Sequence, residues 1–198
     1  MRAVLAAERP KDSVLGEEYG TQGTSARRWI LDPIDGTKNY VRGVPVWAVL
    51  IALLDGDDVR MGVVSAPALG RRWWAERGRG AFCTDAPGGE PRRLRVSAVS
   101  ALADASLSYS DDRGWSDRGA DAGLVALLAQ TWRQRAYGDF WSHMMVAEGA
   151  VDVAAEPELK PWDVAALMPV VIEAGGRCTG YDGIVRAIAS VAGERSQA

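Results

Sequence analysis

Short apolar runs separated by turn-forming residues fill the first half of the chain, and this pattern predicts β-strands joined by tight turns. Residues 45–54 and 59–65 are rich in β-branched side chains, and Asp-Gly-Asp-Asp lies between them. Two such runs joined through Asp-Gly are a strong signal for a β-hairpin. The other strands expected in this half are 28–31, 72–76, 80–82, 94–96 and 105–109. The first half therefore predicts antiparallel hairpins.

Helical and extended segments alternate in the second half. Residues 139–148 suit a helix with Asp139 as its N-cap and Gly149 at its end, and residues 163–174 suit an apolar helix that Pro169 kinks. The remaining segments are helices at 1–8 and 120–130 and strands at 131–136 and 151–155. Hairpins followed by alternating strands and helices predict a layered α/β or α+β fold.

Composition narrows the possible functions without selecting one. The chain has 198 residues, enough for one domain, of which 47% are hydrophobic and 25% charged, as in an ordinary globular protein. A net charge of −3 gives no reason to expect nucleic acid as a partner. No apolar stretch reaches the roughly 18 residues of a membrane helix. Two separated cysteines without a secretory signal favour reduced thiols and a cytoplasmic location.

Five carboxylates lie where apolar segments begin or end. Asp32 and Asp35 follow Trp-Ile-Leu in WILDPIDGT, Glu17 and Glu18 follow Val-Leu-Gly, and Asp163 opens an apolar helix. Taken singly, Asp163 is explained as a helix N-cap, and Asp-Pro and Asp-Gly are explained as turns. Neither explanation accounts for the second acidic pair upstream. A Mg²⁺ site, which combines a few carboxylate oxygens with a substrate phosphate, accounts for the whole set.

The residues after Asp35 predict an anion site beside this cation site. Gly36 and Thr37 stand at the start of an expected helix, where free backbone N–H groups and the positive end of the helix dipole favour an anion. The Thr37 hydroxyl can also orient a water molecule. A cation site next to an anion site indicates a phosphate ester as the substrate. Two metal ions about 3.5–4 Å apart would bind both the attacking and the leaving oxygens of such an ester.

Three motifs together resemble the inositol monophosphatase superfamily of Mg²⁺-dependent phosphatases. They are Gly-Glu-Glu at 16–18, WILDPIDGT at 29–37, and Pro-Trp-Asp-Val-Ala-Ala at 161–166 followed by Glu-Ala-Gly-Gly at 173–176. The resemblance covers residues 14–179. It implies a layered α/β/α/β sandwich that lacks the family's first helical layer, a homodimer, and hydrolysis of a phosphate monoester without a covalent enzyme intermediate.

The resemblance also implies a role for each motif residue. The metal ligands, for two or three Mg²⁺ per site, would be Glu17, Asp32, the Ile34 carbonyl, Asp35 and Asp163. Glu17 and Thr37 would position the attacking water, and Asp35 would belong to the catalytic group. The amides of Gly36 and Thr37 would hold the phosphate.

Within the family, residues 37–48, 65–75 and 137–159 are most similar to bacterial histidinol-phosphate phosphatases of histidine biosynthesis. That substrate carries an amine and an imidazole, so acidic contacts from Asp139 and Glu156 would suit it. Asp139 is equally well explained as a helix N-cap, and His143, the only histidine, is better explained as a packed or surface residue than as a catalyst. An inositol-phosphate or other sugar-phosphate phosphatase is the alternative of the same chemistry. A metal-binding fragment without turnover is the alternative of another class.

Both ends of the chain depart from the family pattern. The family begins with a helical pair that carries a further acidic residue, and residues 1–13 match only the remnant of such a helix. After Thr179 the family continues with another strand and helix, whereas residues 180–198 are poorly matched. We therefore expect one phosphatase domain over residues 1–198, truncated at its N-terminus and ending in a divergent tail.

Overall fold

Two β-sheets and their flanking helices make up residues 1–110 and 112–178, the part of the chain that the computed structural model describes. The strands are β1 (Ser13–Gly16), β2 (Gly20–Gln22), β3 (Arg27–Asp35), β4 (Ala48–Asp55), β5 (Asp58–Ala66), β6 (Arg71–Glu76), β7 (Gly80–Thr84), β8 (Arg92–Arg93), β9 (Ser106–Tyr109), β10 (Arg133–Arg135) and β11 (Val153–Ala155). The helices are α1 (Arg2–Glu8), α2 (Thr37–Val41), α3 (Asp112–Ser116), α4 (Asp121–Gln130), α5 (Asp139–Ala147), α6 (Pro161–Val164) and α7 (Leu167–Glu173). The expected tail at 180–198 lies outside the described residues.

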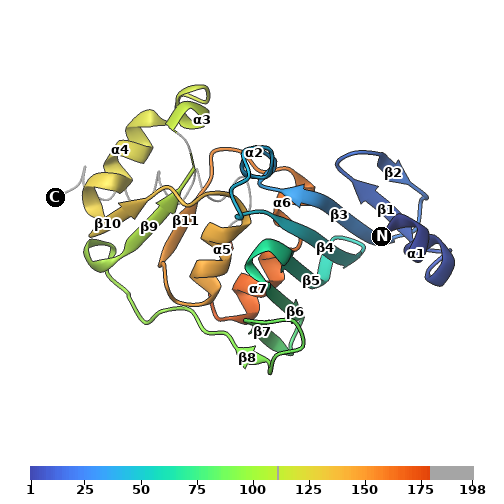
Figure 1. The fold of residues 1–198 in the computed structure, drawn as a ribbon. Helices are drawn as coiled ribbons and strands as arrows, with labels where there is room; N and C mark the ends of the chain where they lie inside the picture. The colour runs from blue at the N-terminus through green and yellow to red at the C-terminus, as the bar shows by residue number, and fades with distance from the viewer. Residues whose placement is uncertain (111, 179–198) are drawn as a thin grey trace.

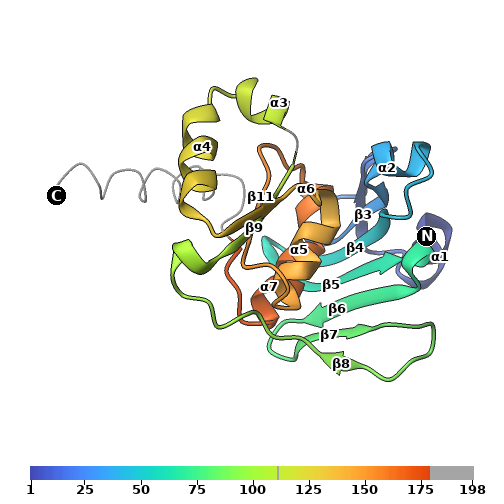
Figure 2. The same cartoon turned by 60° about the vertical axis from the view of Figure 1, so that its left-hand side comes forward.

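The elements form layers (Figures 1 and 2). The large sheet has the strand order β2-β1-β3-β4-β5-β6-β7-β8, and the small sheet has the order β10-β9-β11. Helices α5 and α7 lie between the two sheets, and α3 and α4 lie beyond the small sheet (Figure 2). This order of sheet, helices, sheet and helices confirms the layered α/β sandwich that the sequence predicts.

Strands β3 to β8 form an antiparallel meander, and β1 joins it in parallel beside β3. The expected hairpin is confirmed, because Asp55 pairs with Asp58 at the turn between β4 and β5. The strand expected at 94–96 is wrong. The edge strand ends at Arg93, and the next residue, Leu94, turns its side chain into the core, where it is 1% exposed.

Strand β3 continues beyond its expected end at residue 31. It runs to Asp35, so the Asp-Pro-Ile-Asp sequence is part of the sheet rather than a turn. The pairing with β4 becomes irregular between Asp32 and Asp35, where Pro33 has no N–H to donate. The irregularity matters for the orientation of the two carboxylates, as described below.

A row of small residues lets the helices approach the large sheet closely. Ala52 pairs with Gly62, Gly62 with Ala75, and Ala75 with Ala81 across four neighbouring strands. A Cβ atom on Gly62 would lie 2.2 Å from the carbonyl oxygen of Ala166, which joins α6 to α7. This segment of backbone therefore rests directly on the sheet. We call these four residues the small-residue row.

The helix expected at 163–174 is wrong in one respect, because it is divided into α6 and α7. Pro169 is the third residue of α7, and a proline there needs no hydrogen-bond donor, since the first N–H groups of a helix have no intrahelical partner. Pro169 thus favours a new helix start rather than a kink. The N-cap of α6 is Lys160, and Asp163 follows three residues later.

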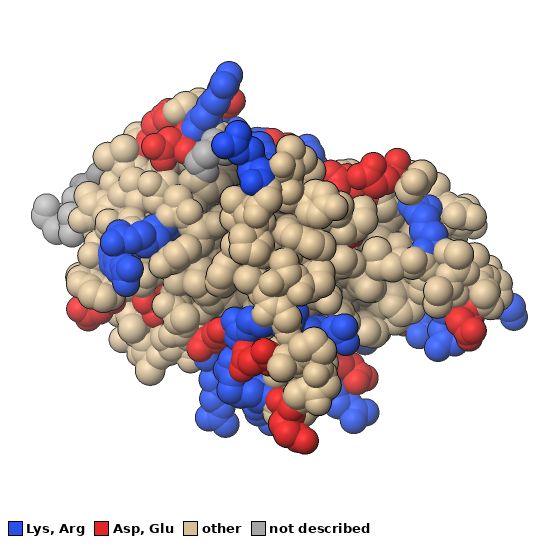
Figure 3. Space-filling model, viewed as in Figure 1, with Lys and Arg blue, Asp and Glu red and all other residues tan. Residues whose placement is uncertain are grey.

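On the face shown in Figure 3, positively and negatively charged side chains lie next to one another. Arg71 illustrates the mixture, because it pairs with Glu148 at 2.8 Å and donates through Nε to Asp85 at 2.8 Å. Arg71 is partly buried, so its ion pair with Glu148 is packed against the protein rather than fully solvated. Within the described ranges, no helix has both the length and the apolar character needed to cross a membrane.

Candidate active site

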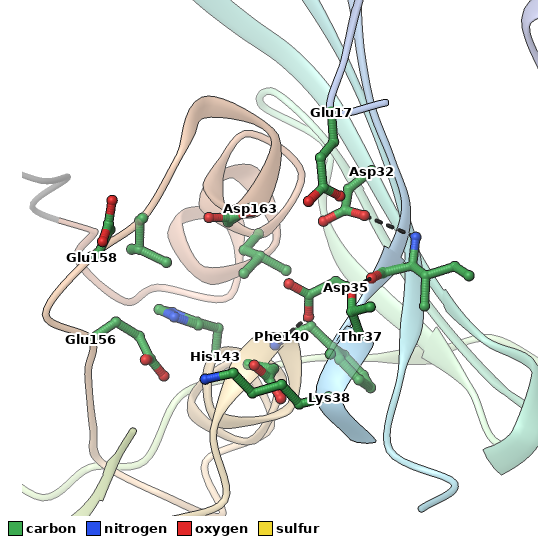
Figure 4. A pocket seen from close by; sticks show the side chains of 15 residues that line it. Glu17, Asp32, Asp35, Thr37, Lys38, Phe140, His143, Glu156, Glu158 and Asp163 are labelled. Carbon is green, nitrogen blue, oxygen red and sulfur yellow. Dashed lines mark hydrogen bonds between the residues drawn. The ribbon is translucent and has the colours of Figure 1, made fainter. Parts of the chain in front are cut away.

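Nine of the residues expected from the sequence line one pocket, and of the five carboxylates at the borders of apolar segments only Glu18 does not line it (Figure 4). They come from the end of β1, from β3 and α2, from the first turn of α5, and from the segment that contains α6. The residues are Glu17, Asp32, Ile34, Asp35, Gly36, Thr37, Asp139, Glu156 and Asp163. The fold therefore assembles segments that are far apart in the sequence around a single cavity.

Asp32, Asp35 and Asp163 form a close carboxylate cluster. One oxygen from each lies within 4.8 Å of the others. Side chains three residues apart on a regular strand point to opposite faces, so Asp32 and Asp35 would diverge in an undistorted β3. The irregular pairing between them removes this alternation and allows both to reach one side. Asp163 arrives from α6.

A backbone N–H group holds each carboxylate of this cluster. Asp32 accepts from the Ile34 N–H at 2.9 Å, and Asp35 accepts from the Phe140 N–H at 2.8 Å. Both bonds are drawn in Figure 4. Asp163 accepts from the Lys160 N–H at 2.6 Å. The side chains are therefore fixed before any ligand arrives, which is the preorganisation that a metal site requires.

Keeping these neighbouring, at least partly buried carboxylates charged without a cation costs free energy, and their pKa values are raised as a result. Burial raises the pKa of Asp32 to about 7, with Glu17 and Asp163 adding repulsion. Burial also raises the pKa of Asp35 well above its ordinary value, and of Asp163. A divalent cation would relieve both the repulsion and the desolvation. An all-oxygen donor set suits Mg²⁺, so the residues present fit the ion that the sequence predicts.

Glu17 stands at the edge of the cluster. It is exposed and lies outside the group of three oxygens that approach within 4.8 Å. Figure 4 shows its carboxylate beside that of Asp32. Burial raises the pKa of Glu17, followed by repulsion from Glu18 and Asp163. Glu17 is thus placed to complete a cation site from the solvent side.

The first turn of α2 adjoins the cluster. Thr37 Oγ1 donates to the Ile34 carbonyl at 2.8 Å. Gly36 has a φ of 80°, and a Cβ atom there would lie 2.9 Å from the carbonyl oxygen of Val46, so only glycine fits. Gly36 and Thr37 both line the pocket at the start of α2, where the N–H groups of a first helical turn can bind an anion.

Asp139 is not the N-cap of α5, which corrects the sequence interpretation. Gly138 occupies that position, and Asp139 is the first helical residue with a φ of 51°, in the left-handed region. Its Oδ2 accepts from Asn39 Nδ2 of α2 at 3.1 Å. A non-glycine residue held in this region is strained, and such strain concentrates at functional sites.

A profile of the Inositol monophosphatase family matches residues 1–196.

The chain belongs to the inositol monophosphatase family.

Relatives within the family show which members this chain is similar to. It is 57% identical over 187 residues to a histidinol-phosphatase of Streptomyces coelicolor, a match that spans 92% of this chain and 70% of that protein. It is 58% identical over 185 residues to a histidinol-phosphatase of Mycobacterium tuberculosis, spanning 93% of this chain and 71% of that protein. Among solved structures, Mycobacterium tuberculosis SuhB matches with a TM-score of 0.78 and 34% identity over 89% of this chain and 69% of that one.

The structure of this inositol monophosphatase family member adds residues that the sequence did not single out. Lys38, Phe140 and Glu158 line the pocket, and Asn39 holds Asp139. Lys38 and Asn39 directly follow the Gly-Thr motif, so their position beside it was the available signal. His143 is buried, as the packing interpretation predicts, yet it also lines the pocket.

Replacing Asp32 by asparagine should stabilise the metal-free protein, increasingly so as the pH rises. Because the folded-state pKa of Asp32 is about 7 against an ordinary value of 3.8, folding favours its protonated form. The contribution of Asp32 to the free energy of unfolding is fully present below pH 4, and it is lost as the pH rises through 7. With EDTA, we expect the melting temperature of Asp32→Asn to exceed that of wild type by roughly 5 °C at pH 8 and by little at pH 4.5.

Comparing the melting temperatures of Asp32→Asn and wild type at the same pH cancels the effect of other titrating groups on stability. One of these is His143, whose lowered pKa changes stability in the opposite direction between pH 4 and 6.5. Saturating Mg²⁺ should reverse the order, because wild type gains a ligand that the variant lacks. Asp57→Asn, in the exposed turn between β4 and β5, serves as the control. A constant difference between Asp32→Asn and wild type across pH would contradict the prediction.

Proposed function

We propose that this chain hydrolyses histidinol phosphate to histidinol and inorganic phosphate with Mg²⁺. The observation that carries the proposal is a pocket lined by a carboxylate cluster and by two further carboxylates, Asp139 and Glu156. The 57–58% identity to two histidinol-phosphatases supports the same substrate. The cluster suits the phosphate end of a substrate with its metal ions, and the further carboxylates suit a cationic leaving group.

Charge in the pocket favours an amine-bearing alcohol over a neutral polyol. Beyond the cluster and Glu17, the lining contains Asp139, Glu156 and Glu158, with Lys38 as a positive residue. Glu158 pairs with Lys160 at 2.5 Å and Arg118 at 2.8 Å, so its charge is balanced from outside the pocket. By formal charge, the two carboxylates of Asp139 and Glu156 outnumber Lys38 among the remaining lining residues. An ammonium group gains a charge-assisted hydrogen bond in such surroundings.

Each residue of the cluster has a proposed part in the reaction. Glu17, Asp32, the Ile34 carbonyl, Asp35 and Asp163 would hold two or three Mg²⁺. When bound, these ions supply positive charge that acidifies a water and neutralises the phosphate oxygens. Glu17 and Thr37 would aim the water at phosphorus, and the Gly36 and Thr37 N–H groups would bind phosphate oxygens. A P–O bond forms to water, the ester P–O bond breaks, and a water proton ends on the departing alcohol.

Phosphate release under initial-rate conditions tests the proposal. The substrates are histidinol phosphate, inositol 1-phosphate and a sugar phosphate, each with Mg²⁺ and with EDTA. We expect kcat/KM for histidinol phosphate to exceed the others by at least about tenfold, equivalent to about 1.4 kcal/mol of transition-state binding. A preference for inositol 1-phosphate would instead identify the chain as an inositol-phosphate phosphatase. Folded protein that binds Mg²⁺ but releases no phosphate would identify a non-catalytic binding protein.

We also propose, from the family resemblance, that the chain forms a homodimer and acts in the cytoplasm as one phosphatase domain. Light scattering at micromolar concentration tests the first statement, and fractionation of the source cells tests the second. A monomer by light scattering, or recovery in another compartment, would contradict the corresponding statement.

A further inference from the structure

His143 is a buried polar side chain in the wall of the pocket. It lies on α5 one helical turn after Asp139, and the same pocket is lined by Glu156. The side chain is 8% exposed, and its Nε2 atom has no hydrogen-bond partner in the part of the chain that the structure describes. Buried polar atoms in native proteins are nearly always paired. An unpaired nitrogen in the wall of a binding pocket therefore points to a ligand.

The position of His143 suits the leaving group rather than the phosphate. Figure 4 shows Asp32, Asp35 and Glu17 on one side of the pocket and His143 and Glu156 on the other. A phosphate held at the cluster would extend its ester arm toward the second side. His143 is three residues beyond Phe140, whose N–H binds Asp35, which places it about 4.5 Å further along the helix axis. That separation is within reach of a short carbon chain.

The imidazole of His143 is uncharged at neutral pH, because burial lowers its pKa to about 4. A neutral imidazole carries one donor and one acceptor nitrogen. It recognises a ligand through a directed hydrogen bond rather than through net charge. The carboxylates of Asp139 and Glu156 attract cations of many shapes, so a directed bond beside them adds the selectivity that charge does not provide.

We propose that His143 determines specificity by a hydrogen bond from or to its Nε2 with a nitrogen of the departing alcohol. The proposal rests on the proposed function, since it requires a nitrogen-bearing phosphate monoester. Nε2 is covered in the ligand-free chain, so binding includes a side-chain adjustment in the pocket wall, of a kind that is common at binding sites. His143 contacts neither the phosphate nor the attacking water and is assigned no part in the chemical step.

Three substitutions separate recognition from packing. His143→Gln keeps an amide near the position of Nε2, His143→Asn places the amide closer to the backbone, and His143→Leu removes the polar atoms. The matched control is Ser142→Ala, the neighbouring buried polar residue of α5, which bonds to Ser108 at 2.6 Å outside the pocket. Each variant is assayed with saturating Mg²⁺ on histidinol phosphate and on p-nitrophenyl phosphate, which lacks a nitrogen-bearing alkyl arm.

We expect His143→Leu and His143→Asn to raise KM for histidinol phosphate by about ten- to thirtyfold with kcat nearly unchanged. The values for p-nitrophenyl phosphate should stay within about twofold of wild type, and His143→Gln should recover most of the loss. Ser142→Ala should change melting temperature without changing the ratio of the two substrates. If His143→Leu does not fold, the comparison between the Gln and Asn variants carries the test.

Two results would overturn the assignment of His143 alone. They are an unchanged substrate ratio in every variant, and a parallel loss on both substrates that follows the melting temperature. In either case wild type would still prefer histidinol phosphate. A wild-type enzyme without that preference would instead overturn the proposed function and this assignment together. The wild-type ratio therefore distinguishes the two failures.

Discussion

Asp35→Asn is expected to reduce phosphate release by at least about 10³-fold while leaving the protein folded. Asp35 is buried and connects β3 to α5, since its carboxylate belongs to the cluster and accepts the Phe140 N–H. An amide in its place keeps the shape but loses the charge that would hold a cation. A buried carboxylate whose pKa is raised is also costly without metal, so the metal-free variant should melt at the same or a higher temperature.

Three measurements on the same preparation check this prediction. They are the rate of phosphate release, the Mg²⁺ affinity by calorimetry, and the melting temperature with EDTA. Asp57→Asn, an exposed substitution of the same chemistry, should leave all three near wild type. Activity of Asp35→Asn within tenfold of wild type would remove Asp35 from the catalytic group. An unfolded variant would show that its role is structural.

Gly62→Ala is expected to lower the free energy of unfolding by about 3 kcal/mol. The new methyl would stand 2.2 Å from the Ala166 carbonyl oxygen and 2.7 Å from a carbon of the Pro169 ring. Since backbone cannot rotate away as a long side chain does, the segment joining α6 and α7 must move off the sheet. Asp163 lies on α6, so this shift should also weaken Mg²⁺ binding although Gly62 is not a site residue.

Urea denaturation with EDTA measures the stability change, and calorimetric Mg²⁺ titration measures the second effect. Met61→Ala is the matched control, because Met61 neighbours Gly62 on β5 but lines the opposite face of the sheet. It should cost stability through lost packing while leaving Mg²⁺ affinity unchanged. Equal Mg²⁺ affinity in Gly62→Ala and wild type would argue against mechanical coupling between the sheet and Asp163.

The sequence predicted the antiparallel hairpins and the layered fold because local signals specify them. Asp-Gly between two β-branched runs gave β4 and β5, and Gly149 ended α5 as expected, with a φ of 72°. Features that depend on contacts between distant segments could not be predicted from the sequence. The continuation of β3 to Asp35 depends on pairing with β4, and the turn of Leu94 into the core depends on the packing of other elements.

The sequence indicated most of the charged residues that line the pocket, while their roles stay predictions. Carboxylates at the borders of apolar segments, with the family resemblance, led to nine lining residues, and Glu18 was the one border carboxylate that does not line the pocket. Two features needed the structure. One is the left-handed conformation of Asp139 together with its hydrogen bond to Asn39, a residue a hundred positions earlier. The local sequence contains no signal for that contact. His143 in a Trp- and Met-rich helix reads as packing until the fold places it against the cavity.

The small-residue row has a consequence for how mutational maps of this family should be understood. Ala52, Gly62, Ala75 and Ala81 share one register across four strands, and at Gly62 the backbone that joins α6 to α7 rests directly on the sheet. We expect larger side chains in this row to displace that backbone and, with it, Asp163 of α6. A saturation screen scored by growth would therefore mark these positions as intolerant alongside the carboxylates. Sensitivity to substitution at these positions would reflect the distance between the sheet and the helices. Residues far from the reacting atoms would therefore be needed for activity.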